Sequence, residues 1–133
     1  MLPSTIERVP RHTSSDINER IRRKTIRSIE HYRHAPKHEV RRRLAELERE
    51  WDIERTLEAN AASIALAGLL LGLFADRRFL AIPGIVCAFL LQHALQGWCP
   101  PVPVFRRYGF RTQPEIDEER FALRALLEKG DSR

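Results

Sequence analysis

Residues 59–75 read ANAASIALAGLLLGLFA, and residues 79–98 read FLAIPGIVCAFLLQHALQGW. Neither stretch contains a charged residue. As helices with a rise of ~1.5 Å per residue they would extend about 26 and 30 Å, close to the roughly 30 Å hydrocarbon core of a bilayer. The linker between them, Asp76-Arg77-Arg78, is long enough only for a tight turn. The sequence therefore predicts an all-α protein built on a two-helix transmembrane hairpin over residues 59–98.

A buried hairpin inside a soluble helical bundle is the alternative to a membrane hairpin, because core helices have similar apolar runs. The segments on either side of residues 59–98 carry only thin apolar stripes among many charges. Such stripes could not cover two helices that are apolar on all sides. We therefore expect the lipid bilayer to surround the hairpin.

The charged residues of the chain are concentrated in its two flanks. Residues 1–58 contain 14 Lys/Arg and 11 Asp/Glu, and residues 99–133 contain 7 and 6, for a net charge of +5 over the whole chain. Because acids alternate with bases in both flanks, this pattern indicates solvated helical surfaces and argues against a nucleic-acid track.

The distribution of basic residues predicts the orientation of the hairpin. The loop between the spans has two arginines, and more lie close to the outer ends of the spans. By the positive-inside rule, both termini are expected in the cytoplasm. The flanking arginines are Arg41, Arg42, Arg43, Arg49, Arg55, Arg106, Arg107, Arg111 and Arg120. An aromatic belt on the same side is predicted from Trp98, Phe105, Tyr108 and Phe110.

The N-terminal flank divides into two segments. Residues 1–36 read as a basic tail, mobile or partner-bound at its start, with a short amphipathic helix that begins near Ile17 and ends by Pro36. Residues 37–58 read as a charged cytoplasmic helix. No breaker precedes Asn60, so this helix could continue into the first span. Its apolar stripe is Val40, Leu44, Leu47 and Trp51.

The C-terminal flank, residues 99–133, is predicted to begin with a proline-rich exit and to end in a helix. Proline removes backbone donors and favours extended backbone, so the chain should leave the helix at Cys99-Pro100-Pro101-Val102-Pro103. Thr112 and Glu115 have the T-x-x-E spacing of a capping box. A cytoplasmic helix is therefore expected from about Gln113 to Glu128.

Two patterns within the spans indicate helix packing. Polar residues form an edge at the cytoplasmic end, which suggests interhelical hydrogen bonds or, in an oligomer, a path for protons or a small solute. The residues of this edge are Asn60, Ser63, Gln92, His93 and Gln96. Gly68 and Gly72 form a G-x-x-x-G motif, with Gly84 and Ala88 as a small pair on the second span. These small residues favour either self-association or packing of the two spans.

Chemically reactive side chains are few. His31, His34 and His38 have a metal-like spacing, but Pro36 interrupts the helix needed to align them, so no metal is expected. No catalytic constellation is visible, and no cofactor is predicted. Cys99 lies just after a helix end, where a thiol could be reached, and it is the one candidate thiol site.

The run GLLLGLFADRRFLAIPGIVCAFLLQHALQGWCPPVPVFRRYGF resembles the YgaP-like family of inner-membrane transmembrane hairpins, a domain of unknown function. The resemblance covers roughly residues 59–110, and its hallmark is the step Gly97-Trp98-Cys99-Pro100. It implies a multi-pass protein of the bacterial inner membrane. Because members are often linked to sulfurtransferase domains, it also implies a sulfur connection, in which Cys99 alone carries over by position.

These patterns together predict a non-enzymatic accessory subunit of the membrane. It would self-associate as a homo-oligomer or join a larger membrane protein complex through its cytoplasmic helices. The alternative is a sulfur-handling or redox accessory protein that uses Cys99 at the cytoplasmic membrane face.

Overall fold

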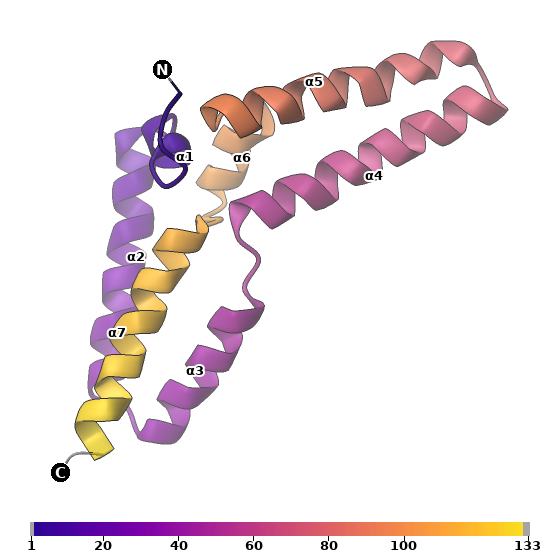
Figure 1. Cartoon of the computed structure of the whole chain (residues 1–133). Helices are drawn as coiled ribbons and strands as arrows, with labels where there is room; N and C mark the ends of the chain where they lie inside the picture. The colour runs from indigo at the N-terminus through magenta and orange to yellow at the C-terminus, as the bar shows by residue number, and fades with distance from the viewer. Residues whose placement is uncertain (1, 132–133) are drawn as a thin grey trace.

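The computed structural model describes residues 2–131, and over that range the chain is helical without a strand (Figure 1). An all-α fold is thus confirmed. The elements are α1 (Arg8–Arg11), α2 (Ser15–Arg33), α3 (Lys37–Arg49), α4 (Ile53–Phe74), the 3-10 helix η1 (Arg77–Leu80), α5 (Ala81–Gln96), α6 (Pro101–Arg107) and α7 (Gln113–Asp131).

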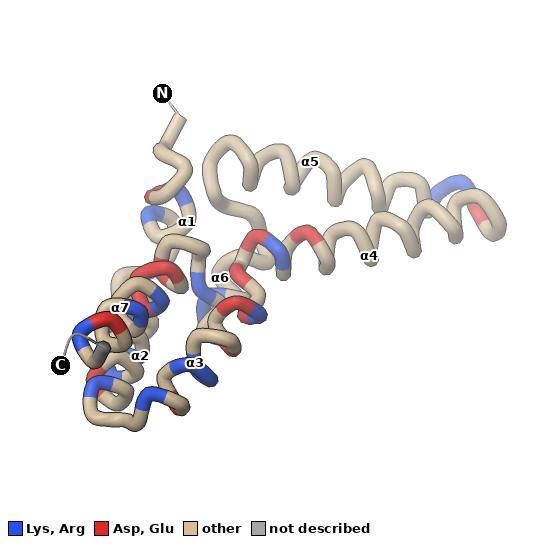
Figure 2. The backbone as a smooth tube through the Cα atoms, turned by 60° about the horizontal axis from the view of Figure 1, so that its bottom comes forward, with Lys and Arg blue, Asp and Glu red and all other residues tan. Residues whose placement is uncertain are grey.

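Helices α4 and α5 run antiparallel, side by side, and project away from the other helices (Figures 1 and 2). The structure has two helical segments long and apolar enough to cross a membrane, one ending at Phe74 and the other spanning Arg77–Gln96. Within the most apolar stretch of each segment, only 17% and 6% of the residues are buried inside the chain. The two apolar helices are therefore largely uncovered by the rest of the protein.

The tip of the hairpin is a capped tight turn. The Asp76 side chain accepts a hydrogen bond from the backbone N–H of Arg78 at 2.9 Å, which caps η1. Figure 2 shows the basic pair of the turn at the end farthest from the other helices.

Gly68 and Gly72 are buried where α4 meets the other arm of the hairpin. A Cβ on Gly68 would lie 2.7 Å from Ile82 Cβ, and one on Gly72 would lie 2.7 Å from Leu80 Cγ. The G-x-x-x-G motif is therefore used for packing within the hairpin. Gly84, by contrast, is exposed and has open space around it.

Helices α2, α3 and α7 form a bundle, with α7 packed against both others. Its core contains Val40 and Leu47 from α3 and Ile116 and Leu123 from α7. Most of the apolar stripe predicted on residues 37–58 is used here, because Leu44 packs against the same cluster.

The helix predicted over residues 37–58 is broken in the structure. Helix α3 ends at Arg49, and α4 begins at Ile53. Asp52 caps α4 by accepting the backbone N–H of Arg55 at 3.0 Å, and the Ile53 N–H donates to the Arg111 carbonyl at 2.8 Å. The prediction that the helix of residues 37–58 could continue into the first span is thus wrong. The two contacts provide acceptors for backbone N–H groups at the start of a separate helix, α4. Trp51 falls in the break and is 44% exposed instead of packing in the stripe.

The proline-rich exit is helical instead of extended. Helix α5 ends at Gln96, two residues before the end of the predicted span, and the next residue, Gly97, takes a left-handed conformation with φ of 79°. The next residues turn, and α6 starts at Pro101. Prolines in a first helical turn lose no hydrogen bond, since those N–H groups have no partner within the helix. Val102 of α6 is fully buried.

The N-terminal segment is packed against the molecule. Helix α1 carries Val9, which is 2% exposed and lies in a core cluster with Ile53, Leu57 and Val102. The stretch around Val9 is therefore packed, whereas residues 2–7 are mostly exposed, and a mobile or partner-bound start stays a prediction. Helix α2 begins at Ser15, two residues before the predicted start.

Candidate functional site at the base of the hairpin

The base of the hairpin brings together Glu54, in the first turn of α4, and His93, in the last turn of α5. An antiparallel pair of helices places these two ends at the same level. His93 Nε2 lies 2.8 Å from Glu54 Oε2, and the His93 side chain is only 5% exposed. The imidazole ring is therefore held by a carboxylate from the other arm of the hairpin.

Arg8 closes this pair from the N-terminal segment. Its Nη2 donates to Glu54 Oε1 at 2.8 Å, and its Nη1 donates to the carbonyls of His93 at 2.8 Å and Ala94 at 3.3 Å. These carbonyls lie in the last turn of α5, where the helix leaves backbone acceptors available. The His93 carbonyl also accepts the Gly97 N–H at 2.7 Å. A guanidinium at that end is also favoured by the helix dipole. Arg8 thus caps α5 and orients Glu54.

Gly97 makes the approach of α1 possible. A Cβ at this position would lie 2.5 Å from the carbonyl carbon of Arg8, and the positive φ also favours glycine. A side chain on residue 97 would therefore push the N-terminal segment away from the end of α5.

Cys99 is buried beside His93. The sequence predicts a thiol that could be reached from solvent, so this prediction is wrong. It is 3% exposed and belongs to the cluster that contains Val9 and Leu57. His93 Nδ1 is buried and, among residues 2–131, has no partner with good hydrogen-bond geometry. The Cys99 thiol is close enough to interact with the ring electrostatically. The side chains therefore form a row: the Cys99 thiol, the His93 imidazole, the Glu54 carboxylate and the Arg8 guanidinium.

Cys99 also lines an apolar groove of ≈ 380 Å³ that begins at the hairpin base, beside the start of α6, and runs between α4 and α5 as far as Ile82. Apart from Cys99, the polar side chain in its wall is Asn60. The rest of the lining is apolar and includes Ile64, Ile85 and Phe89.

The predicted polar edge is only partly assembled. Asn60 and Gln92 are half-buried, and Gln96 is exposed. The Ser63 hydroxyl donates to the Ala59 carbonyl of its own helix at 2.7 Å. Among the described residues, the side-chain hydrogen bond between α4 and α5 joins His93 to Glu54, which is not part of the predicted edge. Glu54 was missed by sequence reasoning, because it precedes the apolar run.

Arg106 is buried as part of a polar network below the hairpin, although the sequence placed it among the basic residues flanking the membrane. It is 1% exposed, and its guanidinium donates to Glu115 Oε1 at 2.7 Å and to Asn18 Oδ1 at 2.8 Å. Glu115 in turn accepts the backbone N–H of Thr112 at 3.1 Å, as expected in a capping box. Arg106 therefore ties α6 to α2 and α7.

Arg111 forms a second buried network. Its guanidinium contacts Glu119 at 2.6 Å and also pairs with Glu50. Glu119 is fully buried and is shared by Arg43 and by the hydroxyl of Ser28. Burial by itself would raise the pKa of the Glu119 carboxyl, but the hydrogen bonds from Arg43, Ser28 and Arg111 outweigh it and hold that pKa below its usual value. This network therefore pairs two further arginines, Arg43 and Arg111, that the sequence placed among the basic residues flanking the spans.

The aromatic belt is also only partly present at the surface. Tyr108 is 78% exposed, whereas Phe105 and Phe110 pack edge to face, with centroids 5.6 Å apart, against the cluster that contains Val9. Trp51, which the sequence placed in a helix stripe, lies exposed at the start of α4 with the Arg55 guanidinium 4.5 Å above its ring.

No group of three or more His, Cys, Asp or Glu side chains within the described part of the chain could hold a metal ion. Of the spaced histidines, His31 packs edge to face on Tyr32, with ring centroids 4.9 Å apart.

Comparisons with known proteins leave the resemblance to YgaP-like hairpins as a prediction. No protein-family model, curated protein or solved structure matches the chain.

Proposed function

We propose that this chain is a small integral protein of the bacterial inner membrane, of the YgaP-like hairpin type. In this proposal α4 and α5 cross the bilayer, and both termini lie on the cytoplasmic side. The bundle of α2, α3 and α7 acts there as an accessory subunit that binds a second copy or a larger membrane complex.

One observation carries this proposal. The buried charged side chains of the bundle have partners within the chain, whereas the apolar faces of α4 and α5 are not covered by it. The bundle has its own apolar core and two buried ion networks. The outer faces of α4 and α5 carry large apolar side chains that are each more than half exposed in the single chain, such as Leu66, Leu73, Ile85 and Leu91. In water those faces would remain uncovered, whereas lipid covers them and the helices satisfy their own backbone groups.

Membrane integration can be tested directly on cell membranes. An integral hairpin should stay in the pellet after extraction at alkaline pH and appear in the soluble fraction only with detergent. Release of the full chain by alkaline carbonate would contradict the proposal.

The orientation is tested by cysteine labelling in a background that carries Cys87→Ser and Cys99→Ser. Arg78→Cys, at the hairpin tip, should react with a membrane-impermeant maleimide on intact spheroplasts. Glu128→Cys, in α7, should react only after lysis. The reverse pattern would place the termini outside the cytoplasm.

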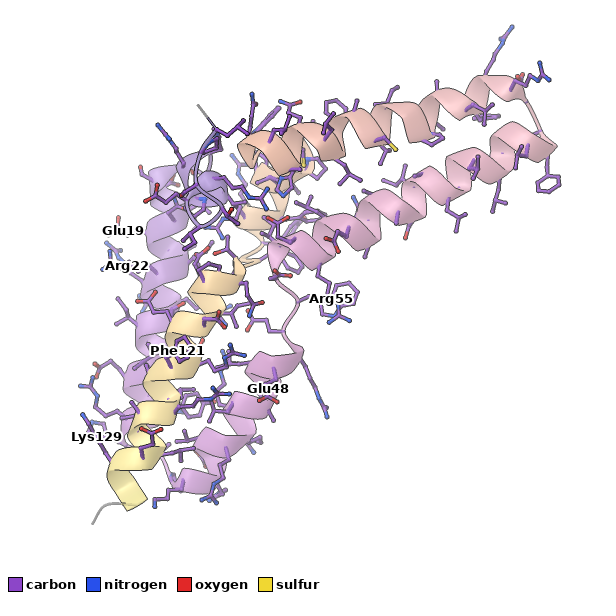
Figure 3. The ribbon with its side chains drawn as sticks, viewed as in Figure 1. Glu19, Arg22, Glu48, Arg55, Phe121 and Lys129 are labelled. Carbon is purple, nitrogen blue, oxygen red and sulfur yellow. The ribbon has the colours of Figure 1, made fainter. Side chains whose placement is uncertain are left out.

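The accessory role is supported by exposed side chains on the outer faces of the bundle. Figure 3 shows Glu19 and Arg22 on α2, Glu48 on α3 and Phe121 on α7 pointing outward. Phe121 is 62% exposed, so its ring is available to a partner on the outer face of α7. Extraction in a gentle detergent, affinity purification and mass spectrometry should therefore recover a stoichiometric partner or a defined oligomer. Phe121→Ser should weaken that association, with Phe74→Ser at the hairpin tip as the control. Recovery of the chain as a monomer from native membranes would contradict this role.

A sulfur-handling or redox role for Cys99 is the alternative function. The position of Cys99 near the His93 ring, which Glu54 holds, favours it, since an adjacent base activates a thiol. The burial of Cys99 weighs against it, because a water-soluble sulfur carrier would have to displace α1 or the hairpin base. Cys99→Ser discriminates between the two roles: assembly should survive the substitution, and thiol chemistry should not.

A further inference from the structure

The groove at the hairpin base combines an apolar wall with two polar side chains, Asn60 and Cys99. Several of its lining residues are well exposed, among them Ile64 at 45% and Ile85 at 56%, so the groove opens on the outer surface of the hairpin. A ligand that fits this groove must be mostly hydrocarbon, with one polar group placed near Asn60 and Cys99.

The thiol in this groove has the partners that nucleophilic chemistry requires. A thiol needs a base to take its proton, and the base needs a third group to hold its ring. Glu54 fixes His93 through Nε2 at 2.8 Å, which leaves the buried and otherwise unpartnered Nδ1 for the thiol side. Arg8 fixes Glu54 in turn. The order from thiol to carboxylate is the order of a cysteine–histidine–acid triad.

We propose that Cys99 is an acylation site that accepts a long-chain acyl group from an acyl thioester of the acyl-CoA class, whose acyl chain enters the groove from the lipid side. A bond forms between Cys99 Sγ and the carbonyl carbon, and the bond from that carbon to the carrier sulfur breaks. His93 Nδ1 takes the thiol proton and returns it to the departing carrier thiolate. The products are S-acylated Cys99 and a free carrier thiol, so the exchange needs no oxidant or reductant.

Asn60 supplies the other element of this site. Its side-chain amide, on the wall of the same groove, can donate a hydrogen bond to the thioester carbonyl oxygen as charge develops there. The acyl chain then lies along the apolar wall between α4 and α5. This inference goes beyond the accessory role and does not depend on which partner the bundle binds.

The chain contains its own control for non-specific thiol acylation. Cys87 is exposed on α5 and is not among the residues that line the groove. An acyl thioester that has entered the bilayer can reach this lipid-facing thiol, so uncatalysed transfer should label Cys87 at least as fast as Cys99. Transfer directed by the site should favour the buried one.

The experiment uses the purified full-length protein in lipid nanodiscs with alkyne-tagged palmitoyl-CoA. We expect a hydroxylamine-labile label that maps to Cys99, is lost in Cys99→Ser and persists in Cys87→Ser. Acetyl-CoA should react at least 10-fold more slowly. Absence of label on Cys99, equal labelling of Cys87, or equal rates with acetyl-CoA would overturn the proposal.

Two further variants separate catalysis from structure. His93→Gln should slow acylation by about 100-fold or more, as expected when a general base is lost. Asn60→Leu keeps the groove apolar and removes the amide, and it should slow acylation by at least 10-fold. Reaction of Cys99 with a small apolar maleimide should change less than 2-fold in Asn60→Leu, so this variant remains informative if His93→Gln fails to fold. An unchanged acylation rate in Asn60→Leu would remove Asn60 from the site.

Discussion

At the residue scale, the buried arginines show how the same side chain serves two roles. Arg106 and Arg107 are neighbours in α6, yet Arg106 is buried and bound to Glu115 and Asn18, whereas Arg107 is exposed. Removing one partner from a buried pair leaves the other charge uncompensated. Arg106→Leu should therefore lower the free energy of unfolding of the bundle by about 3 kcal/mol, and Arg107→Leu should change it by less than about 0.5 kcal/mol. Thermal melts followed by circular dichroism in mild detergent measure the difference, and equal effects would mean that the Arg106 network contributes nothing.

Glu119 gives the bundle a dependence on pH whose sign follows from its partners. Its pKa in the folded chain lies below the ordinary value of 4.5 because Arg43, Ser28 and Arg111 stabilise the carboxylate against the opposing effect of burial. The resulting stabilisation is fully present above about pH 4.5 and is lost as the pH falls through the lower folded pKa. Glu119→Gln should flatten the loss of stability in this acid range, whereas Glu118→Gln, at an exposed neighbouring position, should retain it. A Glu119→Gln protein as acid-sensitive as the parent would contradict this assignment.

At the element scale, the close packing of α4 against η1 and α5 depends on two glycines. A leucine at Gly68 would place its Cβ against Ile82 and Pro83, and atoms so near the opposing backbone can move only if the helices separate. We expect Gly68→Leu to destabilise the hairpin by about 2 kcal/mol through overpacking. Gly84→Leu, where the structure shows open space, should be nearly neutral. Melting temperatures of the two variants in detergent test this, and equal values would rule out close packing through Gly68.

The end of α5 offers a second test at this scale. Gly97 and Gly109 both have positive φ, so alanine at either position carries a similar backbone cost of about 1 kcal/mol. Only at Gly97 would the new methyl group also meet Arg8. Gly97→Ala should therefore displace α1 and increase the rate at which Cys99 reacts with a water-soluble maleimide by about 10-fold or more, whereas Gly109→Ala should leave that rate within 2-fold. A similar rate in both variants would show that α1 does not cover Cys99.

At the scale of the whole molecule, the hairpin and the bundle meet through few elements. Helix α4 contacts α6, and Arg8 of α1 reaches the ends of both arms of the hairpin. The hairpin projects from the end of the bundle where α1 and α6 lie (Figure 1). Residues 8–11 and 99–107 thus join the apolar and charged parts into one structure, and Cys99, His93 and Glu54 lie at that joint.

The sequence by itself determined that the chain is helical and where its apolar helices lie, because hydropathy and helical periodicity are local properties. It also located α7 through the Thr112–Glu115 capping box, since a cap depends on residues three apart. Tertiary structure alone decided which charged residues are buried. In the sequence, nothing distinguishes Arg106, Arg111 and Glu119 from their exposed neighbours. They are buried because α2, α3 and α7 pack together. The pairing of Glu54 with His93, 39 positions apart, likewise required the fold of the hairpin. Proximity between distant residues depends on how helices pack, which no short stretch of sequence records.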